Sequence, residues 1–158
     1  MRLAQPKTYF YSFEEYLEAE RKADERSEFI DGEIYAMAGE SGRHGDISAN
    51  FLALIVAKLR GSECRARTKD TKVESGALKE RFGKGMISYP DIIVICGEPE
   101  YNDKHTDIVL NPAVIIEVLS DATEEFDRGV KFMRYRNFND TLTDYILVSQ
   151  DEPHIEHY

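Results

Sequence analysis

One carboxylate lies inside an otherwise apolar stretch of the sequence. Glu117 interrupts the run from Val114 to Leu119, which is typical of a buried strand. Burying a lone carboxylate is costly unless it is paired, protonated or bound to a metal. Because strand side chains alternate between faces, Glu117 should project with Ile115 and Leu119 and needs a partner there. A structural ion pair with a core lysine or arginine is the alternative.

Asp91 is the second residue that could take part in chemistry. It follows Pro90 and opens the apolar run from Ile92 to Cys96, which predicts another strand. If the two strands pair, the carboxylates of Asp91 and Glu117 converge. Such oxygen ligands suit Mg²⁺ or Mn²⁺, and the cation can activate a water and neutralise charge on a phosphodiester. Alternatively, Asp91 ends a loop, as aspartate often does.

The N-terminal half predicts two helices and a hairpin that would support these acids. Ser12 and Glu15 have the spacing of a capping box, so a helix should begin there. Two apolar runs flank Asp31-Gly32, which predicts a β-hairpin. A second helix is expected over 44–60, ending at Gly61. Its apolar residues at helical spacing are Ile47, Phe51, Leu54, Ile55 and Leu59.

The C-terminal half adds strands and another helix. We expect a half-exposed strand over 64–73 and a glycine-containing, charged loop over 75–88. A helix should start near Thr123 and bury a face formed by Phe126, Val130 and Met133. Strands are expected over 145–148 and, at a sheet edge, over 154–158. The order predicts one α/β domain over 1–158, with a mixed central sheet flanked by helices and an N-terminal hairpin.

Composition limits the classes of function. The chain has 158 residues and a net charge of −10, which argues against a general nucleic-acid binder but not against a nuclease with metal-binding acids. Cys64 and Cys96 lack metal-ligand spacing, which argues against a zinc site or a disulfide framework. The N-terminus lacks the apolar run of a signal peptide, and no stretch is long enough for a membrane span. A cytoplasmic location without membrane association is therefore expected.

Several motifs together resemble a known family. They are the segment Glu28 to Glu33, Tyr89-Pro90-Asp91, and Glu117 to Ser120 followed by Asp127, Lys131 and Tyr135. In order and spacing they resemble the Uma2 family, also called DUF820, within the restriction-endonuclease-like PD-(D/E)xK nucleases. The resemblance covers nearly the whole chain. That family usually continues for another strand or two, so C-terminal strands are expected to be missing here.

The resemblance implies a Mg²⁺-dependent (or Mn²⁺-dependent) DNA endonuclease that hydrolyses phosphodiester bonds. Asp91 and Glu117 would hold the metal, and Glu28 would match an acidic ligand from the N-terminal region. The backbone carbonyl of Val118 is a further candidate ligand. For Glu28, a solvated acid in a charged run is an equally good interpretation.

The signature lysine of such nucleases is absent from its usual place, where this chain has Leu119. The resemblance makes Lys131, on the following helix, the preferred catalytic substitute and Lys72 the second choice. The plain alternative for Lys131 is a surface ion pair with Asp127 four residues earlier. His44 could support the site or contact phosphate, but we expect a capping or surface role.

Two other functions remain open. Leu119 and the acidic charge also suit a catalytically inactive module that keeps the nuclease fold for nucleic-acid binding or assembly. Hydrolysis of another phosphate ester is a weaker alternative, since the sequence has no glycine-rich phosphate loop. We also expect a homodimer, because such nucleases commonly pair to cut two strands and the residues from Tyr9 to Phe13 provide an aromatic patch.

Overall fold

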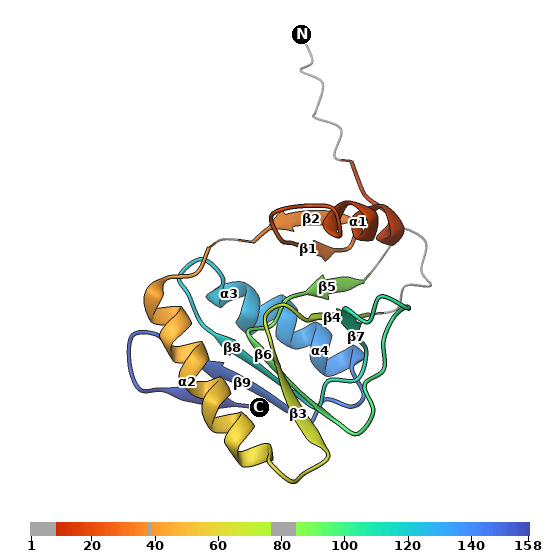
Figure 1. The fold of residues 1–158 in the computed structure, drawn as a ribbon. Coiled ribbons are helices and arrows are strands. Elements are labelled where there is room, and N and C mark those ends of the chain that lie inside the picture. Colours follow the sequence, from red (N-terminus) through yellow and green to blue (C-terminus); the bar gives the residue numbers. More distant parts are fainter. Residues whose placement is uncertain (1–8, 38, 77–84) are drawn as a thin grey trace.

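Two mixed sheets form the framework of the protein. The computed structural model describes residues 9–37, 39–76 and 85–158, and Figure 1 shows their arrangement. The expected α/β class, with mixed strands, flanking helices and an N-terminal hairpin, is confirmed, and its strands are divided between two sheets. The first sheet has the order β2 (Glu33–Ala36), β1 (Ser27–Ile30), β5 (Met86–Ser88), β4 (Lys72–Ser75) and β7 (Ile108–Val109). The second has the order β10 (Ile155–His157), β9 (Asp144–Val148), β8 (Val114–Val118), β6 (Ile92–Cys96) and β3 (Cys64–Thr68).

The helical segments connect and cover these sheets. They are α1 (Phe13–Glu20), α2 (Gly42–Leu59), α3 (Glu124–Phe126), the π-helix η1 (Asp127–Lys131) and α4 (Phe132–Phe138). The capping box predicted at Ser12 and Glu15 is present, with both reciprocal hydrogen bonds formed. No helix within the described ranges is both long and apolar enough to cross a bilayer.

The predicted hairpin places Glu28 in the first sheet. Strands β1 and β2 pair antiparallel across Asp31-Gly32, where both residues have positive φ, 50° and 93°. Such a turn matches the twist of paired strands, and glycine at its second position avoids backbone strain. β1 also pairs with β5, so Glu28 lies inside the sheet with 8% of its surface exposed.

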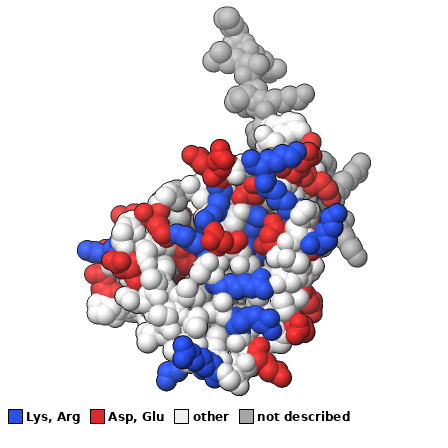
Figure 2. Space-filling model, viewed as in Figure 1, with Lys and Arg blue, Asp and Glu red and all other residues white. Residues whose placement is uncertain are grey.

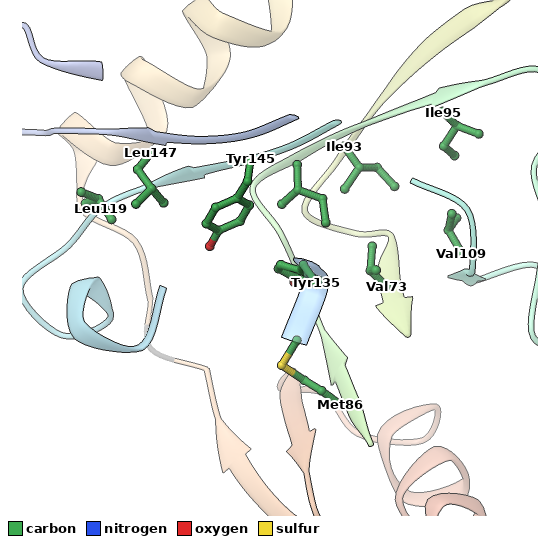
Figure 3. Packing of buried hydrophobic residues seen from close by; sticks show 10 residues of the cluster. Val73, Met86, Ile93, Ile95, Val109, Leu119, Tyr135, Tyr145 and Leu147 are labelled. Carbon is green, nitrogen blue, oxygen red and sulfur yellow. The ribbon is translucent and has the colours of Figure 1, made fainter. Parts of the chain in front are cut away.

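The second sheet has different partners on its two faces. On one face, Ile116 and Val118 form a buried cluster against residues of α2 such as Phe51. On the other, Ile115 and Leu119 belong to the core cluster that includes Tyr135 of α4. Figure 3 shows Leu119, Leu147 and Tyr145 of this region with Tyr135, and Val73 and Met86 across from them. The expected alternation along β8 is therefore confirmed, and it directs Glu117 towards α4.

Several local predictions need correction. The single strand expected over 64–73 is two strands, β3 and β4, because the chain turns between them. In the loop expected over 75–88, Met86–Ser88 is the buried strand β5, and residues 77–84 lie outside the described residues. The expectation that Cys64 and Cys96 form no disulfide is also wrong in this structure. They are bonded to each other, because antiparallel pairing of β3 with β6 places them directly opposite one another.

Candidate active site

Asp91 and Glu117 meet where β6 and β8 lie side by side. The antiparallel register pairs Ile92 with Ile116, and its continuation places Asp91 opposite Glu117. The Asp91 N–H donates to Glu117 Oε2 at 3.4 Å, and the Val118 N–H donates to Asp91 Oδ2 at 2.7 Å. The structure thus brings together the two acids on which the sequence prediction depended.

Lys131 is the basic group at the centre of this site. Its side chain is buried, and its Nζ lies 3.2 Å from Glu117 Oε1 and 3.3 Å from Glu28 Oε1. Glu28 Oε1 also accepts a hydrogen bond from the Tyr89 N–H at 2.9 Å. Glu28 is therefore a buried member of the cluster, and the interpretation as a solvated surface acid is wrong.

Lys72, the second-choice lysine, has other partners. Its Nζ lies 2.9 Å from Asp107 Oδ2 and 5.2 Å from the centre of the Tyr89 ring. Leu119, at the usual position of the lysine, is buried in the apolar core. Of the two lysines considered, Lys131 is the one in contact with Glu117.

A π-helix carries Lys131 into the site. Asp127 and Lys131 are the first and last residues of η1, and both are buried, with 3% and 5% of their surface exposed. Single π turns inside helices occur frequently at functional sites. The ion pair considered for these two residues is present, but its expected surface location is wrong. The predicted apolar face is also wrong in part, because Val130 and Met133 are exposed.

Burial and like charges shape the protonation of this cluster. Burial raises the pKa of Glu117 well above its usual value. Nearby carboxylates raise this pKa further, and Lys131 offsets only part of the rise. Burial also raises the pKa of Asp127. For Lys131, burial alone would lower the pKa, but Glu117 and Glu28 raise it well above its usual value. The raised pKa of Lys131 favours its charged form, and the raised pKa values of Glu117 and Asp127 indicate that Lys131 alone does not offset the acidic groups around it.

A second set of ligand-type side chains adjoins Asp91. His44 Nε2 lies 3.1 Å from Asp91 Oδ2, and His44 Nδ1 lies 3.1 Å from Glu40 Oε2. Glu40 also forms an ion pair with Lys69. The hydrogen bond to Asp91 raises the pKa of His44. The expected capping or surface role of His44 is wrong, because the N-cap of α2 is Ser41, whose Oγ accepts from the His44 N–H, and the His44 imidazole lies in the site.

The side chains of this site could hold a metal ion, with carboxylate oxygens and one imidazole nitrogen as ligand atoms. Glu40, His44 and Asp91 have ligand atoms within 4.8 Å of one another, the one such group of three among the described residues. Glu28 and Glu117 do not form a comparably tight group with Asp91. The Lys131 ammonium lies between Glu28 and Glu117 and contacts both carboxylates. Carboxylate oxygens are the ligands that Mg²⁺ and Mn²⁺ prefer, and excess negative charge favours a cation.

The sequence interpretation underestimated Asp127 and Glu40. For Asp127 the sequence favours a surface pair with Lys131, although the four-residue spacing already predicts contact between the two side chains. Glu40 precedes α2 in a glycine-containing stretch, where nothing in the sequence distinguishes it from other surface acids. Its place beside Asp91 depends on how α2 packs against the second sheet, which the sequence does not encode locally.

Comparison with known proteins gives consistent results. The family described as "Uma2: Putative restriction endonuclease" matches residues 13–158. Two uncharacterized proteins of Synechocystis sp. (strain PCC 6803) are 37% and 35% identical, over 92% and 91% of this chain and 72% and 77% of their own lengths. A crystal structure from Anabaena variabilis, described as "a putative nuclease belonging to DUF820", superimposes with a TM-score of 0.71. It is 18% identical and is matched over 93% of this chain and 83% of that chain, so it shows a shared fold.

Proposed function

This chain belongs to the Uma2 family, and on that premise we propose that it is a Mg²⁺- or Mn²⁺-dependent endonuclease that hydrolyses phosphodiester bonds in DNA. The observation that carries the proposal is the meeting of Asp91 and Glu117 at paired strands, with Lys131 in contact with Glu117. Family membership alone would leave open whether this chain keeps a usable site.

Each residue has a distinct part in the proposed reaction. Asp91, Glu117 and Glu28 would hold the cation, which when bound supplies a more acidic water and neutralises charge on the phosphodiester. Lys131 would place its ammonium beside the reacting phosphate and stabilise the charge that develops there. The N–H of Val118 and the imidazole of His44 both donate to Asp91 Oδ2 and so fix the orientation of that carboxylate.

Basic side chains near the site support a nucleic-acid substrate. On the face drawn in Figure 2, acidic and basic side chains are interspersed, and basic ones cross its middle. β3 lies across this face in Figure 1 and carries Arg65 and Arg67. The end of β3 pairs with the start of β6, since Thr68 is opposite Ile92, next to Asp91. Phosphate contacts from such a strand would lead a DNA backbone to the carboxylates.

We also propose that the protein acts as a cytoplasmic homodimer. Large apolar side chains stand exposed at the N-terminal end and on α2, namely Tyr9, Phe10 and Leu54. Such side chains could pack in an interface between copies, and two copies would place two active sites on one duplex. Light scattering at micromolar concentration should give twice the mass of the 18.1 kDa chain, and a monomer would contradict the dimer.

The proposed activity can be tested by plasmid cleavage with Mg²⁺ or Mn²⁺. We expect the wild type to nick or linearise the plasmid, and Asp91→Asn and Glu117→Gln to lose that activity. Glu125→Gln is a matched control, because Glu125 is an exposed acid on α3. Cleavage that is equal in all four proteins, or absent from all of them at every metal concentration, would contradict the proposal.

The inactive nuclease-fold module is a second candidate. Leu119 at the lysine position and the net charge of −10 favour it. It predicts no carboxylate-dependent metal binding and no cleavage, and calorimetry with Mg²⁺ or Mn²⁺ run beside the plasmid assay separates the two functions.

A further inference from the structure

Asp127 has a buried oxygen whose contacts are incomplete. Asp127 is 3% exposed, and its Oδ1 accepts no hydrogen bond from any described residue, although Lys131 Nζ lies 3.3 Å away. A buried acceptor without a hydrogen bond is costly and requires an explanation. Its backbone is fixed, because the Tyr145 hydroxyl donates to the Asp127 carbonyl at 2.8 Å. The side chain is therefore held close to the ammonium without being fully engaged by it.

Lys131 and a divalent cation would depend on the same two carboxylates. The ammonium contacts Glu117 Oε1 and Glu28 Oε1, and both residues are proposed metal ligands. Two positive charges held by the same pair of carboxylates repel each other strongly in a buried site. When the cation binds, the ammonium must move away from Glu117 and Glu28 and still remain near the reacting phosphate.

We propose that Asp127 is the positioning residue for Lys131, and that it retains the ammonium in the site when a divalent cation takes Glu117 and Glu28. The inference rests on the proposed function. Asp127 is the third carboxylate that the ammonium touches, and it lies one π turn away on the same helix, so the lysine needs only a small shift. The oxygen that lacks a hydrogen bond then gains one.

Mn²⁺ affinity measured by calorimetry tests this role through a double-mutant cycle. The proteins are the wild type, Asp127→Asn, Lys131→Met, the double variant, and Glu125→Gln as the control. Lys131→Met should bind Mn²⁺ about tenfold more tightly, because the competing charge is gone. Asp127→Asn should weaken binding about tenfold, because the ammonium then stays on Glu117 and Glu28. In the Lys131→Met background, Asp127→Asn should have little further effect.

Other patterns would overturn the inference. Equal weakening by Asp127→Asn in both backgrounds would make Asp127 a metal ligand. No change in either background would leave it a purely structural residue. If the wild type binds Mn²⁺ but the effects of Asp127→Asn and Lys131→Met on affinity are independent, only this inference is contradicted. If the wild type does not bind Mn²⁺, the proposed function is contradicted as well.

A second measurement covers the case in which Lys131→Met does not fold. Buried, ion-paired ammonium groups exchange slowly enough to be observed by nitrogen-15 NMR. At Mg²⁺ concentrations that saturate both proteins, the Lys131 ammonium signal should shift and persist in the wild type. In Asp127→Asn it should broaden away, because the displaced ammonium has no third carboxylate to contact. Asp127→Glu should restore the signal. An equal response to Mg²⁺ in the wild type and Asp127→Asn would contradict the proposal.

Discussion

Lys131 Nζ lies 3.2 Å from Glu117 Oε1, and both side chains are buried. A buried ion pair of this kind is weak evidence for stability, because desolvation offsets much of the attraction. Here one ammonium faces three carboxylates, those of Glu28, Glu117 and Asp127. The arrangement is therefore better explained by the proposed binding of a cation than by a contribution to the stability of the fold.

Removal of Lys131 should destabilise the protein in a cation-dependent way. Lys131→Met leaves the buried carboxylates without a counter-charge, at a cost of about 3–5 kcal/mol in the free energy of unfolding. Mg²⁺ should restore more stability to this variant than to the wild type, because the cation then has no competitor. Thermal denaturation with and without Mg²⁺ measures both effects. An unchanged melting temperature, or no added effect of Mg²⁺, would be inconsistent with this arrangement of charges.

Returning a lysine to the usual nuclease position should fail in this protein. Leu119→Lys places an ammonium in the core cluster with Leu147 and Tyr145, where it has no acidic partner in that cluster. We expect severe destabilisation and no gain in cleavage, whereas Leu119→Met should be tolerated. Urea denaturation of both variants is the measurement. A stable, more active Leu119→Lys protein would show that Lys131 does not replace the signature lysine.

A separate ion-pair network should control acid stability. Burial alone would raise the pKa of Asp107, but hydrogen bonds from Arg21 and Lys72 lower it below its usual value. A lowered pKa contributes stability at neutral pH that is lost as the pH falls through the folded-state value. Asp107→Asn should therefore be less stable at pH 7, and its stability should fall less steeply between about pH 5 and pH 2. Parallel stability curves for the two proteins would refute this role of Asp107.

The bond between Cys64 and Cys96 should stabilise the chain without serving the site. It closes a loop with a sequence separation of 32 residues, for which chain entropy suggests about 3–4 kcal/mol. In the cytoplasmic location that we propose, the two thiols would be reduced, and the site would have to tolerate that form. A reducing agent, or Cys64→Ser with Cys96→Ser, should lower the melting temperature and leave Mn²⁺ affinity unchanged. A loss of Mn²⁺ binding on reduction would contradict this separation.

Patterns local in sequence predicted much of the fold. The capping box at Ser12, the turn at Asp31-Gly32 and the apolar run around Glu117 each depend on neighbouring residues, and all three are present. The strand β5 was missed because three residues beside glycines give too short a signal. The Cys64–Cys96 pairing was missed because strand register is a long-range property.

The site was predictable from the sequence only where a charged residue interrupts an otherwise apolar pattern. Glu117 was evident because a carboxylate in an apolar strand needs a reason. The family resemblance singles out Lys131, but the burial of Asp127 and Lys131 was not evident, because hydrophobic periodicity selects Val130 and Met133 as the inner face of that helix. The charges of Glu117 and Glu28 reverse that preference by providing a partner for a buried ammonium. Hydrophobic periodicity therefore does not predict the buried face of a helix whose charged residues contact a buried site.

Calorimetric titration with Mg²⁺ or Mn²⁺ tests the central claim most directly, that Asp91 and Glu117 together hold one divalent cation. We expect one binding site per chain in the wild type and in Glu125→Gln. Binding should be lost in both Asp91→Asn and Glu117→Gln, with circular dichroism showing that each remains folded. Unchanged affinity in either variant, or no binding by the wild type, would contradict the account.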